Sequence, residues 1–131
     1  MVIAMDKKRI ILKILGIIVG IIAGCVLLAI LVGAPIMRNM QYNNAMTNAE
    51  NGYYEAALQE LDGRNMDEYK DVKVKKQEYA IEAAKQYTEK EDYEKAYALL
   101  NYAVELEADS DLTKEAEKLL ADIRTQVPYI D

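Results

Sequence analysis

Carboxylates are the side chains in this sequence that come closest to forming a site for chemistry. Four of them gather in one short segment, as Asp62, Asp67, Glu68 and Asp71. Oxygen ligands bind calcium, but the spacing here does not fit the EF-hand pattern, in which ligands alternate and a glycine takes the sixth place. We therefore interpret the segment as a solvated acidic loop and expect no metal site there.

Other catalytic side chains are scarce. The sequence contains no histidine and a single cysteine. Histidine is the commonest general base and metal ligand, so Ser/His and Cys/His pairs are excluded. No glycine-rich phosphate loop occurs either, because the candidate glycines lie inside an apolar stretch. We expect a protein that is not an enzyme and needs no cofactor.

The charges divide the chain into a basic start and an acidic remainder. Residues 1–38 carry five cations and one anion, whereas residues 39–131 carry 11 cations and 21 anions, a net charge of −10. A surface of this charge repels phosphate backbones, so we expect no nucleic-acid partner. It would instead attract a protein with a basic surface.

A long uncharged stretch runs from Ile14 to Met37. As a helix it would be about 36 Å long, more than the ~30 Å hydrocarbon core of a bilayer. The rest of the chain is too small to cover such a helix on all sides. We therefore predict a single transmembrane helix at residues 14–37, in contact with membrane lipid.

The cations that flank this stretch predict its orientation. Four of them precede it, namely Lys7, Lys8, Arg9 and Lys13, and only Arg38 closely follows. The positive-inside rule then places residues 1–13 in the cytoplasm and residues 38–131 on the extracytoplasmic side of the cell membrane.

Three glycines, Gly16, Gly20 and Gly24, recur at every fourth position within the stretch. Glycines at this spacing form a flat strip that lets another helix approach closely. Two interpretations stay open. The strip is either a site of helix–helix association, with a second copy or with a larger membrane protein, or the ordinary glycine content of a membrane helix.

Cys25 raises an alternative form of anchor. The run Ile22-Ala23-Gly24-Cys25 resembles a bacterial lipobox, in which a peptidase cuts before the cysteine and the thiol is lipidated, and the basic start fits a signal peptide. However, the sequence stays apolar from Val26 to Met37, whereas lipoproteins turn polar soon after the cysteine. We favour an uncleaved anchor and keep lipidation at Cys25 as the alternative. Both place the same domain on the same side of the membrane.

The remaining part contains an internal repeat with a constant offset between its two copies. The matches are Ala45 with Ala84, Tyr54-Glu55-Ala56-Ala57 with Tyr93-Glu94-Lys95-Ala96, and Leu61 with Leu100. Apolar residues recur every three or four positions and no stretch alternates with period two, so we predict helices without a sheet. Each copy contains two helices joined by a tight turn, at Asn51-Gly52 and at Glu91-Asp92. A last helix follows, with Ser110 and Asp111 as its N-cap.

This pattern resembles the tetratricopeptide repeat, and in particular a divergent form common in membrane-anchored proteins of Gram-positive bacteria. In that form a Tyr-Lys-Asp run opens each unit, and a Gly-Asp-Tyr-x-x-Ala run lies at its inner turn. The corresponding segments here are Tyr69-Lys70-Asp71, Asn51 to Ala56 and Glu91 to Ala96. The resemblance covers roughly Gln41 to Gln126. The Trp and Pro of the standard repeat are absent, and the offset between copies is longer than the usual ~34.

The resemblance implies a short α-hairpin solenoid of about two repeats plus an end helix that binds another protein. We therefore expect a membrane-anchored protein–protein interaction module, a scaffold or accessory subunit of a larger membrane complex. The alternative is a self-assembling structural membrane protein joined by its glycine strips. If the repeats open a peptide groove, Tyr79, Glu82 and Gln86 share one exposed face at helical spacing and are the candidate partner-binding residues.

Overall fold

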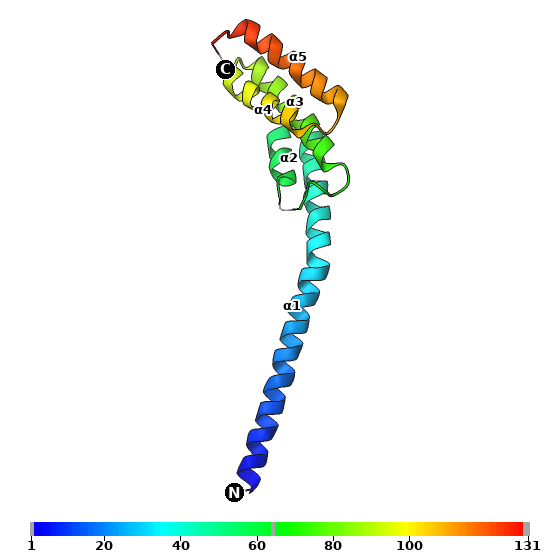
Figure 1. The fold of residues 1–131 in the computed structure, drawn as a ribbon, viewed down its shortest axis with the longest axis vertical. Helices are drawn as coiled ribbons and strands as arrows, with labels where there is room; N and C mark the ends of the chain where they lie inside the picture. The colour runs from blue at the N-terminus through cyan, green and yellow to red at the C-terminus, as the bar shows by residue number, and fades with distance from the viewer. Residues whose placement is uncertain (1, 64, 130–131) are drawn as a thin grey trace. The chain divides into compact units, whose positions relative to one another are not determined.

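The computed structural model describes residues 2–63 and 65–129, apart from the side chains of residues 2–6 and 34. Every regular element in this part of the chain is a helix, which confirms the predicted all-α class. The helices are α1 (Val2–Glu50), α2 (Tyr54–Leu61), α3 (Val72–Glu89), α4 (Tyr93–Leu106) and α5 (Ser110–Gln126) (Figure 1). The chain divides into two units, Met1–Met37 and Arg38–Asp131, and α1 contributes to both.

The first unit is an apolar helical segment without a packed interior. From Lys7 to Met37 no described side chain is buried, and the mean hydropathy reaches 3.1. By its length and composition, α1 is therefore apolar enough to cross a membrane. Pro35 lies inside the helix without ending it, and α1 continues to Glu50.

The second unit contains two apolar cores, and α3 contributes to both. The first core joins the end of α1 to α2 and the start of α3. Its buried members are Ala45, Ala57, Leu61, Met66, Val72 and Tyr79. The second core joins α3, α4 and α5, which lie side by side in Figure 1. Its buried members are Ala80, Ile81, Ala84, Ala96, Leu100, Ala103, Ala116, Leu120 and Ile123.

Small residues set the distance between paired helices in both cores. Four alanines at equivalent places of the internal repeat are at most 1% exposed, namely Ala45, Ala57, Ala84 and Ala96. Because an alanine offers only a methyl group, the helix opposite it can approach closely, and larger side chains fill the space beside it. Leu61 and Leu100, which are also equivalent in the repeat, take that second role and are each 1% exposed.

The two interhelical turns are also equivalent in the internal repeat. Gly52 has φ +81°, and Glu91, at the matching position of the second copy, has φ +60°. Both residues therefore adopt the left-handed conformation that ends a helix, which glycine enters freely and glutamate does not. The glycine at position 52 predicts a left-handed conformation there. The glutamate at position 91 does not predict one.

Adding a side chain at Gly52 and removing the side chain at Glu91 should change the stability of the domain in opposite directions. Gly52→Ala is expected to lower the free energy of unfolding by about 1–2 kcal/mol, because a Cβ is strained at positive φ. Glu91→Gly should raise it by about 0.5 kcal/mol, since relief of that strain exceeds the entropic cost of a new glycine, about 0.5–1 kcal/mol. Thermal denaturation in detergent micelles, followed by circular dichroism, measures both. Equal effects of the two substitutions would contradict the equivalence of the turns.

Side-chain caps begin the last two helices. At the start of α4 the Asp92 side chain accepts a hydrogen bond from the Lys95 amide at 3.4 Å. For α5 the prediction is wrong by one position, because the N-cap is Asp109 and Ser110 is already helical. The Asp109 carboxylate accepts hydrogen bonds from the amides of Asp111 and Leu112, both at 3.0 Å. These amides have no partner within their own helix, so the cap stabilises its first turn.

Candidate docking groove between α3 and α5

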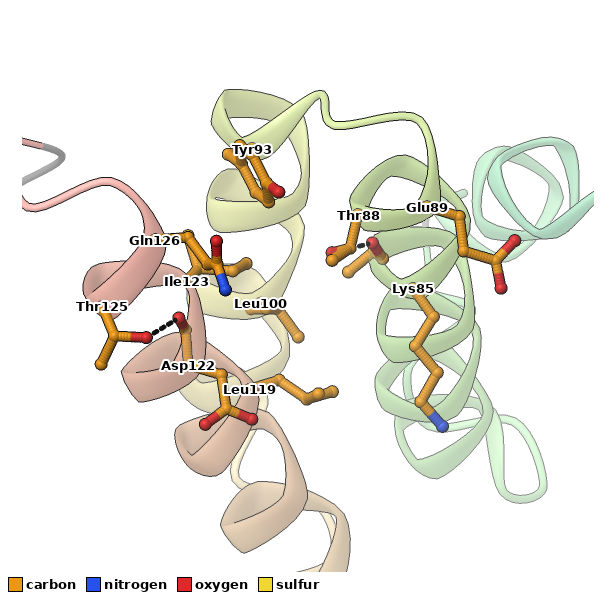
Figure 2. Close-up of a pocket in the computed structure, with 11 residues that line it drawn as sticks. Lys85, Thr88, Glu89, Tyr93, Leu100, Leu119, Asp122, Ile123, Thr125 and Gln126 are labelled. Carbon is orange, nitrogen blue, oxygen red and sulfur yellow. Dashed lines mark hydrogen bonds between the residues drawn. The ribbon is translucent and has the colours of Figure 1, made fainter.

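An open groove with a volume of about 520 Å³ lies in the second unit, between α3 and α5. Figure 2 shows α3 and α5 forming its two walls, with Tyr93 and Leu100 of α4 between them. The apolar part of the lining is Ala84, Tyr93, Leu100, Leu119 and Ile123. The polar part is Lys85, Thr88, Glu89, Asp122, Thr125 and Gln126. An apolar surface edged by a few polar groups is the usual composition of a ligand-binding cleft.

The packing of α4 produces this groove. α4 packs against both α3 and α5, so its Leu100 is buried in the core they share. Leu119 of α5 lies one position before the buried Leu120 and is only half-buried, and in Figure 2 it points toward the gap between α3 and α5. An ion pair ties the two walls together, because Lys85 Nζ of α3 lies 2.9 Å from Glu115 Oε1 of α5.

The charges along the groove are mostly negative. Lys85, the one cation in the described lining, is held by Glu115 and also by Glu82 at 3.1 Å. The hydrogen bond to Glu115 and the second acid raise the pKa of Lys85 despite its partial burial, so it stays charged. Glu89 and Asp122 form no ion pair with the described cations. The groove therefore keeps an unneutralised negative charge.

The predicted partner-binding face is not present as one exposed surface. Tyr79 is 4% exposed, because it packs against the first core. It lies off the alanine stripe of α3, which consists of Ala80, Ala83 and Ala84. Its hydroxyl donates to Met46 Sδ at 3.1 Å, and its ring lies 6.1 Å from that of Tyr54. Burial raises the pKa of Tyr79 to about 12. The expectation that Tyr79 faces outward is wrong.

The other two residues of that predicted face are engaged within the domain. Gln86 is exposed and donates a hydrogen bond to the carbonyl oxygen of Gly52 at 2.9 Å, which fastens the first turn to α3. Glu82 forms an ion pair with Lys85, which lines the groove, but Glu82 itself does not line it. Sequence spacing missed the groove because its walls come from two helices that are not adjacent in the chain. The one sequence signal was Leu119, which widens the apolar stripe of α5 beyond the residues that the core covers.

The acidic loop is organised around a buried lysine. Lys76 is 4% exposed, and its Nζ lies 2.6 Å from Asp67 and 3.4 Å from Asp62. Burial alone would lower the pKa of Lys76, but its hydrogen bonds to these two acids outweigh that effect and raise it. Asp71 instead accepts a hydrogen bond from the Tyr42 hydroxyl at 2.6 Å. Among the described residues, no three acidic or sulfur side chains are placed to share a metal ion.

The three glycines and the cysteine of the apolar segment do not pack against other described residues. A Cβ added to Gly16, Gly20 or Gly24 would meet no described atom within 4 Å. The thiol of Cys25 is free and exposed. The three glycines are spaced along one side of a helix and remain available for contacts outside this chain.

Over the residues that the structure describes, these features define an all-helical protein with one helix that could cross a membrane and a helical unit with an open groove. Comparison with known proteins finds no matching family model, curated protein or solved structure.

Proposed function

We propose that this protein is a membrane-anchored interaction module that binds a segment of another protein in the groove between α3 and α5. It would act as a scaffold or accessory subunit of a larger membrane complex, without catalysing a reaction. The observation that carries the proposal is the groove itself, which combines half-buried Leu119 with the unpaired acids Glu89 and Asp122.

The anchor in this proposal is residues 14–37 of α1. Uncovered isoleucines, leucines and valines surround this part of the helix, and each would have to be hydrated if the chain were dissolved in water. The cations before the segment favour a cytoplasmic N-terminus and an extracytoplasmic second unit.

We further propose that the second unit consists of two tetratricopeptide-like hairpins and an end helix. Support comes from the equivalent burial of Ala45 and Ala84 and from the equivalent left-handed turns at Gly52 and Glu91. Two such units bury a small core, and repeat domains gain stability from each neighbour they pack against. A docked partner would provide such a neighbour for α3 and α5.

The composition of the groove indicates the chemistry of its occupant. Leu119 and Tyr93 offer a contact for one or two apolar side chains, and Asp122 and Glu89 favour a basic residue beside them. The net charge of −10 over residues 39–131 would attract such a segment from a distance and repel an acidic one. We therefore propose a partner segment with an apolar anchor and a lysine or arginine.

Site-specific photo-crosslinking in intact membranes tests this proposal. A benzophenone amino acid is placed at Gln126, in the groove, and in a matched chain at Glu117, which is exposed on α5 and does not line the groove. We expect a crosslink to a second protein from position 126 and none from position 117. Asp122→Lys should lower the crosslinking yield about fivefold, because it replaces attraction of a basic segment by repulsion.

The crosslinked product also separates the alternatives. Mass spectrometry of the product from position 126 is expected to identify a basic peptide of a different chain. A product made only of this chain would support the self-assembling alternative. Equal crosslinking from positions 126 and 117, or a yield that Asp122→Lys leaves unchanged, would contradict docking in the groove.

A further inference from the structure

A cluster of cations and aromatic rings lies where the second unit begins. It comprises Arg38 and Tyr42 of α1, with Tyr69 and Lys70 of the loop between α2 and α3. The rings of Tyr42 and Tyr69 meet edge to face with centroids 5.8 Å apart. Lys70 Nζ lies 4.7 Å from the centroid of Tyr42 and 5.3 Å from that of Tyr69, and Arg38 Cζ lies 5.8 Å from the centroid of Tyr69.

Two positive charges therefore converge on the ring of Tyr69. Neither Arg38 nor Lys70 forms an ion pair with a described carboxylate. Asp71, the residue after Lys70, accepts a hydrogen bond from the hydroxyl of Tyr42, which raises the pKa of Tyr42 to about 12. Asp67 of the same loop is paired with Lys76. In a unit rich in acids, two such cations on one ring leave a place for an anion from outside the chain.

The backbone at Lys70 adds a second, independent observation. Lys70 has φ +46°, a left-handed conformation that is strained for a residue with a Cβ. The loop holds it there, because Met66 is 0% exposed and the amide of Tyr69 donates to the carbonyl oxygen of Met66 at 2.9 Å. This backbone conformation directs the exposed side chain of Lys70 toward the rings of Tyr42 and Tyr69.

Continuity of the chain identifies the anion. Arg38 directly follows Met37, the last residue of the uncharged stretch, so its side chain lies where that stretch ends. If residues 14–37 span a bilayer, the groups within reach of Arg38 include lipid phosphates. Tyrosine rings are enriched at the same depth, with an apolar face and a polar hydroxyl.

We propose that Arg38, Lys70 and the rings of Tyr42 and Tyr69 form a binding site for the phosphate group of a membrane lipid. The inference rests on the membrane anchor proposed above. Arginine binds phosphate oxygens through its planar fork, and lysine adds a point charge. The site fixes the loop between α2 and α3 against the lipid headgroups, and through Val72 and Lys76 it orients the start of α3.

Headgroup quenching in reconstituted vesicles tests this inference on the full chain. In a Cys25→Ser background, Glu68→Cys carries a fluorophore beside the cluster, and Glu117→Cys carries it on α5, where the replaced residue is also an exposed glutamate. The vesicles contain phosphatidylglycerol and a phosphatidylcholine with a nitroxide on its headgroup. We expect strong quenching at position 68 and weak quenching at position 117.

Removing the cations should abolish the difference between the two positions. A basic side chain near an anionic surface contributes about fivefold to binding, so Arg38→Gln with Lys70→Gln should lower the docked-to-undocked ratio by about 25-fold. Quenching at position 68 should then fall to the level at position 117. Lys70→Arg with native Arg38 should retain the quenching, which separates loss of charge from loss of fold.

Three results would overturn the inference, and they are distinguishable. If the chain floats with the vesicles but position 68 is quenched no more than position 117, the anchor stands and the phosphate site is wrong. The site is also wrong if the double glutamine variant, with its helical content unchanged, is quenched as strongly as the native chain. If the chain does not float with the vesicles, the anchor itself fails.

Discussion

Replacing Ile22 and Val26 together by arginine is expected to release the chain from the membrane. Both residues lie near the middle of the uncharged stretch, one helical turn apart, and are 58% and 53% exposed. Arginine at the centre of a membrane helix costs roughly 2.5–3.5 kcal/mol in insertion, so the pair costs about 5–7 kcal/mol. Of the fourteen isoleucines, leucines and valines of residues 14–37, the twelve that the variant keeps contribute about −4 to −7 kcal/mol on the same scale. The two terms nearly cancel.

Extraction of membranes with alkaline carbonate measures this effect. The native chain is expected to stay in the membrane pellet, whereas most of the Ile22→Arg, Val26→Arg chain should appear in the supernatant. Asn43→Arg with Thr47→Arg provides the matched control, because it adds the same charge at the same spacing to an exposed part of α1 beyond the stretch. The control should stay in the pellet. Retention of the first double variant would mean that residues 14–37 are not the anchor.

Gln77→Leu is expected to cause a large loss of stability in the helical unit. Gln77 of α3 is 0% exposed and fastens the region where α4 ends and α5 begins. Its Nε2 donates to the carbonyl oxygen of Ala103 at 2.9 Å and to Thr113 Oγ1 at 2.7 Å. Its Oε1 accepts the amide of Asp109 at 2.9 Å.

Leucine has nearly the same volume as glutamine, so the substitution mainly removes these hydrogen bonds. The amide of Asp109 and the carbonyl of Ala103 would lose a partner in a partly dry environment, and each unsatisfied group costs about 1–3 kcal/mol. We expect the free energy of unfolding to fall by about 3 kcal/mol, which lowers the melting temperature by roughly 12–24 °C in a domain of this size. Thermal denaturation of the full chain in micelles, followed by circular dichroism, measures the shift.

Gln86→Leu is the matched control, since Gln86 lies on the same helix but is exposed and makes one hydrogen bond, to Gly52. It should lower the free energy of unfolding by at most about 1 kcal/mol. Similar shifts for the two leucine variants would contradict the role assigned to Gln77. A larger effect from Gln77→Ala than from Gln77→Leu is expected in addition, because alanine also leaves a cavity.

The helices could be predicted from the sequence because their signals are local. Ala80, Ala83, Ala84 and Tyr87 repeat with helical spacing, and the first three are at most 1% exposed. The left-handed turn at Gly52 follows from its residue type. The predicted start of α5 is wrong by one position. Asp109, Ser110 and Asp111 are all good N-cap residues, and the local sequence does not distinguish among them.

Features that depend on contacts between distant residues could not be predicted in this way. Tyr79 lies off the alanine stripe, which suggests exposure for an isolated hairpin, but the first core covers that side of α3. Gln77 is polar, and only the approach of Asp109 and Thr113, both distant in the sequence, makes its burial favourable. The groove forms only when α3 and α5 both pack against α4, and this arrangement cannot be predicted from the sequence of any one helix.

The reactivity of Cys25 tests the central claim, a membrane span, most directly. It is the only cysteine, and it lies roughly 18 Å along the helix from Lys13, close to the bilayer midplane if residues 14–37 span the membrane. A maleimide reagent reacts with the thiolate, which forms where water reaches the sulfur. We therefore predict that a water-soluble maleimide leaves Cys25 unlabelled in intact membranes and labels it fully after denaturation in sodium dodecyl sulfate. A thiol blocked in both conditions would indicate the lipidated form, and a chain that is labelled rapidly in detergent-free solution would contradict the membrane anchor.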